Sequence, residues 1–384
     1  MSSHEPVVDY VRRIVSEAVL QRASDIHFEP YDSHFRIRYR IDGKLIEVQA
    51  LPLPAPERLV SCLKVMARLD IAEKRLPQDG RIGFPLPGGE RQDLRLSTLP
   101  TVHGEKIVLR LMAPAQVLGL EQLGMEPEQL ELFRLRLAHP HGLVLIAGPT
   151  GSGKSATLYA SLLSMDRLAL NICTVEDPVE VALASVNQVA VNDKAGLGFA
   201  LALRALLRQD PDVIMIGEMR DALTADIAVK AAQTGHLVLS SVHTQSAQAS
   251  LARLVNMGVT PFNLASALNL IISQRLVRRL CPQCRREQTV SVTLLQRLGW
   301  RGIIPPEARC FEARGCPHCS GSGYLGRVGL FELLPLDEET LDTLRECGVP
   351  RLARQASPDL RRAGLNKALA GETTLAEVAA CTPE

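Results

Sequence analysis

The stretch GPTGSGKS has the residue types and spacing of a loop that grips nucleotide phosphates. Gly148, Gly151 and Gly153 let backbone N–H groups turn toward phosphate oxygens, where a side chain would block the approach. Lys154 brings a positive charge to the β and γ phosphates, and the hydroxyl of Ser155 is a suitable Mg²⁺ ligand. An apolar run precedes the loop and a helical segment follows it, so we predict a phosphate site here. The other residues predicted to line it are Pro149, Thr150, Ser152 and Ala156.

Two further apolar runs, VIMI and HLVLSSV, end in Gly-Glu218 and in His243. In open α/β sheets, ligands bind outside the carboxyl ends of the strands. Asp212 lies at the wrong end of its run, on the order of 20 Å from Glu218 along an extended chain. We therefore expect Glu218 to polarise the attacking water and His243 to sense the γ-phosphate. A plain exposed loop carboxylate is the alternative for Glu218.

A third apolar run, ICTV, leads into the acidic segment TVEDPVE. This segment places Glu176, Asp177 and Glu180 close together after a strand. Three neighbouring carboxylates repel one another unless a cation lies near, and a Mg²⁺–nucleotide complex would supply one. We predict that they contribute to the nucleotide site, with helix N-capping as the alternative for one of them.

Two C-x-x-C pairs predict a metal centre. CPQC contains Cys281 and Cys284, and CPHC contains Cys316 and Cys319. Four thiolates in two such pairs suit tetrahedral Zn²⁺, and no open coordination position is indicated. We therefore expect a structural zinc site, with a connecting loop long enough to carry its own structure.

The elements that must position these residues form two regions. From about residue 128, short apolar runs alternate with helical segments, which indicates a parallel sheet covered on both faces. Residues 1–113 are predicted to form a small α+β domain, with a helix over 6–22 and the alternating strand HFRIRYRID before a turn at Asp42-Gly43. Residues 114–127 form a plausible linker.

The remaining boundaries subdivide the second region. Residues 128–384 are predicted to be the nucleotide-binding domain. Within it, 281–325 form the tetracysteine subdomain and 326–384 a helical C-terminal region.

Composition limits the possible function classes. The chain has 384 residues, a formal net charge of +1 and only 4% aromatic residues, which counts against a protein that mainly neutralises nucleic acid. The N-terminal residues lack the pattern of a secretory signal, and no apolar stretch is long enough to span a bilayer. We expect a soluble, cytoplasmic protein with no nucleic-acid partner and no direct membrane insertion.

Several motifs together resemble the traffic ATPases of type II secretion and type IV pilus assembly. GPTGSGKSATLYA, TVEDPVE, LRQDPDVIMIGEMRD and TGHLVLSSVHTQSA are similar to the four nucleotide-site segments of that family. ASDIHFEP, RYRIDG, RLPQDGRI and LRLSTLPTVHGEKIVLRLM resemble the domain that precedes its ATPase core. The resemblance covers nearly the whole chain. The tetracysteine element is typical of assembly-type members, and KRLPQDGRI and LRLSTLP look closest to type II secretion ATPases.

The resemblance implies a RecA-like core preceded by a PAS-like domain, assembled as a homo-hexamer with ATP bound between subunits. It also implies that Arg95 and Arg110 reach from the first domain toward the γ-phosphate. Arg253 and Arg327 match further arginines near that interface. A fixed planar cation there would stabilise the charge that develops in phosphoryl transfer.

The resemblance further implies partners in the inner-membrane secretion platform and a peripheral location when assembled. The sequence starts at the family's second domain, and secretion ATPases commonly dock through an earlier one, so direct docking on the membrane partner stays open. The leading prediction is a Mg²⁺-dependent ATPase of a type II secretion system that powers pseudopilus assembly and protein export.

Three alternatives stay open. The first is a type IV or competence pilus assembly motor with the same chemistry. The second is a nucleic-acid translocating hexamer, which would need a basic channel with aromatic stacking groups. The third is a nucleotide-gated scaffold without turnover.

Overall fold

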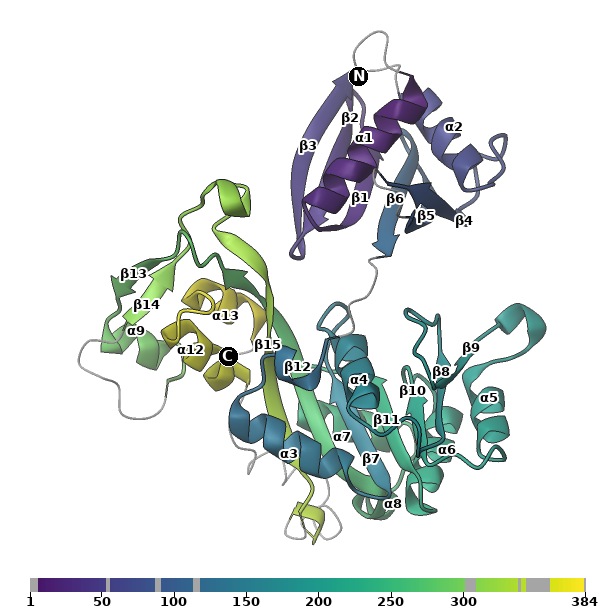
Figure 1. Ribbon diagram of the computed structural model, residues 1–384, viewed down its shortest axis with the longest axis vertical. Coiled ribbons are helices and arrows are strands. Elements are labelled where there is room, and N and C mark those ends of the chain that lie inside the picture. The colour runs from purple at the N-terminus through teal and green to yellow at the C-terminus, as the bar shows by residue number, and fades with distance from the viewer. Residues whose placement is uncertain are drawn as a thin grey trace. The chain divides into compact units, whose positions relative to one another are not determined.

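The computed structural model describes residues 6–52, 56–86, 91–112, 118–300, 309–337, 340–342 and 360–382. The chain divides into two compact units, Met1–Gln116 and Val117–Glu384 (Figure 1). The first part of the predicted linker, up to residue 117, lies outside the described residues.

The first unit is an antiparallel sheet with helices packed on it (Figure 1). Its strands follow the order β3-β2-β1-β6-β5-β4. Its elements are α1 (Val7–Leu20), β1 (Ala23–Pro30), β2 (His34–Ile41), β3 (Lys44–Pro52), α2 (Pro56–Met66), β4 (Gln78–Pro85), β5 (Arg91–Thr101) and β6 (Gly104–Met112).

The alternating pattern of β2 determines which of its faces is buried. Phe35, Ile37 and Tyr39 are fully buried, while the arginines between them are partly exposed. The Tyr39 hydroxyl donates to the carbonyl of Ile14 in α1 at 2.7 Å. The predicted helix, alternating strand and turn are therefore confirmed. The turn at Gly43 has φ +85°, the left-handed geometry that hairpin turns require.

The second unit is built on a seven-stranded sheet in the order β15-β12-β7-β11-β10-β8-β9. All neighbouring strands are parallel except the edge pair β12 and β15. The strands are β7 (Gly142–Ala147), β8 (Ile172–Glu176), β9 (Asn187–Ala190), β10 (Val213–Ile216), β11 (Leu237–Val242), β12 (Leu268–Leu280) and β15 (Tyr324–Pro335).

Helices cover both faces of this sheet, as predicted. On one face, Val144 and Ile146 of β7 pack with α3 and α4. On the other, Leu143 and Leu145 pack with α6, α7 and α8. Every residue of β7, β8, β10 and β11 is buried, which explains their continuous apolar sequences. The helices are α3 (Pro127–Leu137), α4 (Lys154–Leu163), α5 (Phe199–Leu206), α6 (Ala222–Gln233), α7 (Ala247–Asn256) and α8 (Pro261–Ala267), with 3₁₀ turns η1 (Leu120–Gln122) and η2 (Asp193–Ala195).

A small subdomain is inserted between β12 and β15. It contains β13 (Arg286–Thr289), α9 (Val292–Arg297), β14 (Arg309–Glu312) and η3 (Pro317–Cys319), with β13 and β14 paired antiparallel. The connecting segment thus carries its own structure, as expected. Residues 301–308 lie outside the described residues.

The C-terminal region is only partly helical. Helices α12 (Leu360–Leu369) and α13 (Leu375–Cys381) are present. The helical prediction is wrong for residues 326–335, which belong to β15 and pair with β12 along its length. The apolar run VGLFELL is buried by this pairing and by α12, so tertiary packing favours a strand there. Within the predicted helical region, residues 338–339, 343–359 and 383–384 lie outside the described residues.

Candidate phosphate site and metal centre

The glycine loop lies between the end of β7 and the first turn of α4. Gly151 and Gly153 have φ values of +80° and +91°, which side chains rarely adopt. A Cβ atom on Gly148 would lie 2.3 Å from the Ser152 hydroxyl and 2.7 Å from the carbonyl oxygen of Gln274. The conformation and close contacts of the loop therefore require glycine at these three positions. The backbone N–H groups of the loop lie at the start of α4.

Lys154 is folded back over this loop. Its ammonium donates to the carbonyl oxygens of Gly148 at 2.8 Å and Pro149 at 3.0 Å. The side chain is buried, and this burial lowers the pKa of Lys154, although the Glu218 charge opposes the shift. A charged group held at two carbonyls in the loop is well placed to move onto a phosphate.

Glu218 and His243 meet at the carboxyl ends of the neighbouring strands β10 and β11. Their Oε2 and Nε2 atoms are 2.9 Å apart, and the other His243 ring nitrogen, Nδ1, is 3.5 Å from the Lys154 ammonium. Arg220 forms an ion pair with the second carboxylate oxygen of Glu218. Burial alone would raise the pKa of Glu218, but the hydrogen bonds and charges of Arg220 and His243 outweigh it and lower that pKa. Glu218 is therefore held as a carboxylate.

The three carboxylates of TVEDPVE have three different environments. Glu176 is buried and accepts hydrogen bonds from Thr174 at 2.6 Å, Gln188 at 3.0 Å and the Tyr159 hydroxyl. Asp177 is exposed, and its Oδ2 atom lies 3.7 Å from a guanidinium nitrogen of Arg220. Of these three carboxylates, Glu180 is the one with a hydrogen bond to a residue of the phosphate loop, Ser155.

The pair Ser155 and Glu180 shows whether the residues beside the loop suit a divalent cation. The Ser155 hydroxyl is exposed and donates to Glu180 Oε1 at 3.4 Å. A hydroxyl and a carboxylate beside a phosphate loop form the oxygen donor set that Mg²⁺ prefers. These two residues therefore fit a magnesium ion, which would supply positive charge beside the phosphate loop.

Sequence reasoning missed the residues beneath the loop. Gln274 of β12 accepts a hydrogen bond from the Thr157 hydroxyl at 2.7 Å, and its amide would touch any side chain at Gly153. Buried Arg275 donates to the Gln245 carbonyl at 2.8 Å and so ties β12 to the segment after His243. The sequence signal for both was the polar triplet Ser-Gln-Arg, which lies between the apolar runs LII and LV of that strand.

The four arginines taken from the family pattern lie on different elements. Arg95 and Arg110 are in register on β5 and β6 of the first unit, and both are exposed. The Arg110 Nε atom donates to Asp25 at 2.9 Å.

In the second unit, Arg253 is exposed in the last turn of α7, and Arg327 is exposed on β15 opposite Arg278. Within the described residues, neither is hydrogen-bonded to the phosphate loop.

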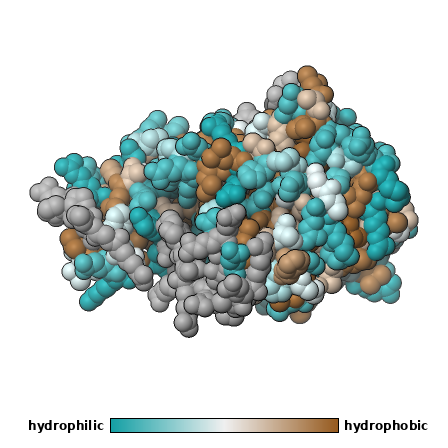
Figure 2. All heavy atoms as spheres, turned by 90° about the horizontal axis from the view of Figure 1, so that it is seen from below, coloured by the Kyte–Doolittle hydropathy of each residue, from teal (hydrophilic) through white to brown (hydrophobic). Residues whose placement is uncertain are grey.

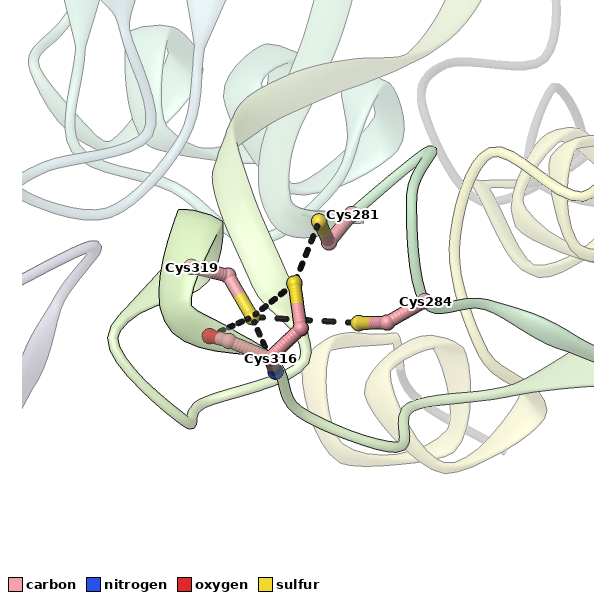
Figure 3. A group of neighbouring side chains, drawn as sticks. All are labelled: Cys281, Cys284, Cys316 and Cys319. Atoms are coloured by element: carbon pink, nitrogen blue, oxygen red, sulfur yellow. Dashed lines mark hydrogen bonds between the residues drawn. The ribbon is translucent and has the colours of Figure 1, made fainter.

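The four cysteines predicted to bind zinc converge (Figure 3). Their sulfur atoms all lie within 4.8 Å of one another, and neighbouring pairs are 3.7, 3.8 and 3.9 Å apart. Zn–S bonds of about 2.3 Å in a tetrahedron give sulfur–sulfur edges of about 3.8 Å. The site therefore fits a four-coordinate zinc ion.

Backbone turns organise these thiols for metal binding. The N–H groups of Cys316 and Gly323 donate to Cys319 Sγ at 3.2 and 3.1 Å. Burial would raise the pKa of Cys319, but these hydrogen bonds outweigh it and lower the pKa, which favours the thiolate.

In the part of the chain that the structure describes, no helix has the length and apolar character needed to cross a membrane. On the face drawn in Figure 2, hydrophobic residues lie in small groups among hydrophilic ones.

Residues 1–380 match the family model described as T2SSE, Type II/IV secretion system protein, and the chain belongs to this family. The type IV pilus assembly ATPase PilB of Acinetobacter baylyi is 48% identical, over 100% of this chain and 68% of the relative. The type II secretion system protein E of Klebsiella pneumoniae is 46% identical, over 99% of this chain and 76% of the relative. Because both names occur at similar identity, these comparisons establish the family and do not separate the two machines.

Solved structures agree with the fold. The ATPase DotB of Legionella pneumophila superposes with a TM-score of 0.69 at 22% identity, covering 98% of this chain and 96% of that one. The pilus retraction motor PilT with bound ADP gives a TM-score of 0.66 at 27% identity, covering 97% of each chain. The predicted fold class, a RecA-like parallel-sheet core preceded by a small α+β domain, is confirmed.

Proposed function

We propose that this chain is an ATP-hydrolysing motor of a type II secretion or type IV pilus assembly machine. One observation carries the proposal: Lys154, His243 and Glu218 form a continuous polar chain at the carboxyl ends of β7, β11 and β10. Such a constellation can hold a triphosphate at one end and a water molecule at the other.

Each residue has a distinct part in this proposal. The loop N–H groups and Lys154 hold the phosphates of ATP, the substrate. Glu218, kept ionised, accepts a proton or hydrogen bond from the attacking water. His243, between them, contacts both groups and can respond to the γ-phosphate. Ser155 and Glu180 would hold Mg²⁺, which neutralises phosphate charge when bound.

Zinc has a structural part in the proposal. The four-cysteine site has no open ligand position, so the ion would hold the inserted subdomain together. The support is the spacing of the four sulfur atoms.

A homo-hexamer is the proposed working form. Arg95 and Arg110 would then complete the site of a neighbouring subunit. The support is family membership and the exposed, in-register placement of these two arginines. We propose a cytoplasmic protein that associates peripherally with inner-membrane platform proteins when assembled.

The finer choice of machine remains a proposal. Type II secretion, with pseudopilus assembly and protein export, is supported by the motifs KRLPQDGRI and LRLSTLP. Type IV pilus assembly is supported by the 48% identity to a PilB protein. Deleting the gene in its host separates the two, because the first predicts loss of an exported protein and the second loss of pili.

The proposed chemistry is tested by measuring ATP hydrolysis against protein concentration, with single-stranded DNA added to half the samples. Specific activity that rises with concentration and ignores DNA would support sites completed between subunits. Strong stimulation by DNA would instead favour a nucleic-acid motor, and no hydrolysis at any concentration would favour a nucleotide-gated scaffold.

A further inference from the structure

The polar chain at the nucleotide site continues beyond Glu218. His243 contacts one carboxylate oxygen of Glu218, and Arg220 forms an ion pair with the other. A second guanidinium nitrogen of Arg220 lies 3.7 Å from Asp177. The side chain of Glu218 is only 14% exposed, whereas that of Arg220 is 60% exposed. The largely buried Glu218 carboxylate is therefore held by the guanidinium of Arg220, which is exposed to solvent.

The backbone around Glu218 is fixed independently of these side chains. The Ser241 hydroxyl donates to the Gly217 carbonyl at 2.7 Å, and the Met219 N–H donates to the Ser241 carbonyl at 2.9 Å. Both bonds attach the segment after β10 to β11. Since the main chain is held on both sides of Glu218, the direction of its carboxylate depends on Arg220 and His243.

Arg220 also lines a cavity of about 400 Å³ beside the site. The lining residues include Asp177, Asp193 and Asp221, and Arg220 is the single cation among them. The charges of Asp177 and Asp193 both favour the protonated guanidinium. Arg220 is thus drawn toward carboxylates on two sides, Glu218 within the site and the aspartates at the cavity.

We propose that Arg220 is a positioning residue for ATP hydrolysis, which orients the Glu218 carboxylate, with Asp177 as the anchor that holds the guanidinium. This inference rests on the proposed function. It also gives Asp177 a different role from the nucleotide contact predicted from the sequence. Arg220 acts through Glu218 and contacts neither substrate nor metal.

The inference has a specific consequence for pH dependence. The titratable or charged side chains that face Glu218 are Arg220, His243 and Lys154. Burial, the largest influence on Glu218, raises its pKa, and Arg220 is the main opposing group. Without Arg220 the Glu218 pKa rises, so its active carboxylate form is lost at a higher pH as the solution is acidified.

The test compares kcat, KM for ATP and the pH profile of kcat for Arg220→Gln, Arg220→Lys and Asp177→Asn. We expect Arg220→Gln to lower kcat about tenfold or more, with KM nearly unchanged, and to move the acid limb to higher pH. Arg220→Lys should keep the acid limb near that of the wild type and recover part of kcat. Asp177→Asn should give a smaller loss, and the double variant with Arg220→Gln should be no worse than Arg220→Gln alone.

Arg204→Gln is the matched control, because Arg204 is an exposed arginine on α5 of the same unit. It should leave kcat and the pH profile unchanged. If the wild type hydrolyses ATP and Arg220→Gln changes neither kcat nor the acid limb, this inference alone is overturned. A raised KM with unchanged kcat would also overturn it, since that result means a nucleotide contact. If Arg220→Gln fails to fold, Arg220→Lys and Asp177→Asn test the same inference through the same measurements of kcat, KM and the acid limb. A wild type without ATPase activity would overturn the proposed function as well.

Discussion

At the scale of single residues, the side chains around Glu218 determine which chemistry its carboxylate can perform. Its position after β10 makes it available to a ligand at the strand ends, but many loop carboxylates are equally placed. The hydrogen bond from His243 and the ion pair with Arg220 distinguish it, because they keep a largely buried carboxylate charged. A charged carboxylate beside a phosphate site is suited to activate water.

Glu218→Gln should therefore lower kcat for ATP hydrolysis about 10²- to 10⁴-fold while leaving ATP affinity nearly unchanged. Because the folded-state pKa of Glu218 is lowered, wild-type activity should persist below the ordinary glutamate pKa and fall as pH drops through the lowered value. Steady-state rates across pH, with nucleotide binding measured separately, check both statements. Asp226→Asn on α6, where Asp226 pairs with Lys230, is the control. A Glu218→Gln protein with wild-type kcat would contradict the role.

Glu176 illustrates the opposite outcome for a carboxylate in the same neighbourhood. Its oxygens are occupied by hydrogen bonds from Tyr159, Thr174 and Gln188, and it is buried. These donors leave little capacity for a metal or a nucleotide. We therefore infer that Glu176 holds α4, β8 and β9 together, in place of the direct contact with nucleotide predicted from the sequence.

Tyr159→Phe should lower the free energy of unfolding by about 1–3 kcal/mol, because it removes a donor from a buried carboxylate. ATP affinity should change little. Denaturant unfolding followed by circular dichroism, together with a nucleotide-binding titration, measures the two quantities. A large loss of affinity without loss of stability would restore Glu176 to the nucleotide site.

Among helices and strands, β12 connects the two candidate sites. Its middle carries Gln274 under the phosphate loop and Arg275 against the Gln245 carbonyl, and its end leads directly into Cys281. Near that end, Arg278 stacks on the Tyr324 ring at 3.8 Å and pairs with Glu377 of α13 at 2.6 Å. The four cysteines lie where β12 ends and shortly before β15 begins, so a zinc ion bound there would hold these two strand ends together.

One zinc ion per chain is expected by elemental mass spectrometry. Cys284→Ser should reduce that content and increase hydrogen exchange in β13 and β14, since metal binding contributes to the folding of its own subdomain. Exchange in β7, at the centre of the sheet, should stay slow. Cys62→Ser is the control and should retain the metal; full zinc content in Cys284→Ser would contradict the assignment.

For the molecule as a whole, the two compact units divide the proposed catalytic groups. The phosphate loop, Glu218 and His243 belong to the second unit, and Arg95 and Arg110 to the first. If active sites form between subunits, each subunit supplies both kinds of group, and different subunits can complement each other's defects.

Mixing Lys154→Ala with Arg110→Ala protein should then recover activity that neither has alone. The recovery should reach up to about a quarter of the wild-type rate, the share of interfaces in a randomly mixed ring that join an intact loop to an intact arginine. Steady-state hydrolysis of the mixture, after subunit exchange, is the measurement. A mixture in a demonstrated mixed oligomer that stays as inactive as its components would exclude completion in trans by Arg110.

Much of this protein can be predicted from local sequence. Glycine spacing before Lys154 and the two C-x-x-C pairs carry their own geometric requirements, and continuous apolar runs indicate strands buried on both faces. These features depend on neighbours in the chain, so spacing alone identifies them. Local sequence led to the wrong prediction for β15, whose apolar run has no distinctive period and is predicted to be helical. That run forms a strand because it pairs with β12.

The contacts within the site depend on the order and register of the sheet. Only the placement of β12 beside β7 brings Gln274 under the phosphate loop, more than a hundred residues away in sequence. The adjacency of β10 and β11 brings Glu218 to His243, and the position of α4 brings Tyr159 to Glu176. Hydrogen bonds and charges act through space over a few ångströms, so tertiary structure assigns these carboxylates their different roles.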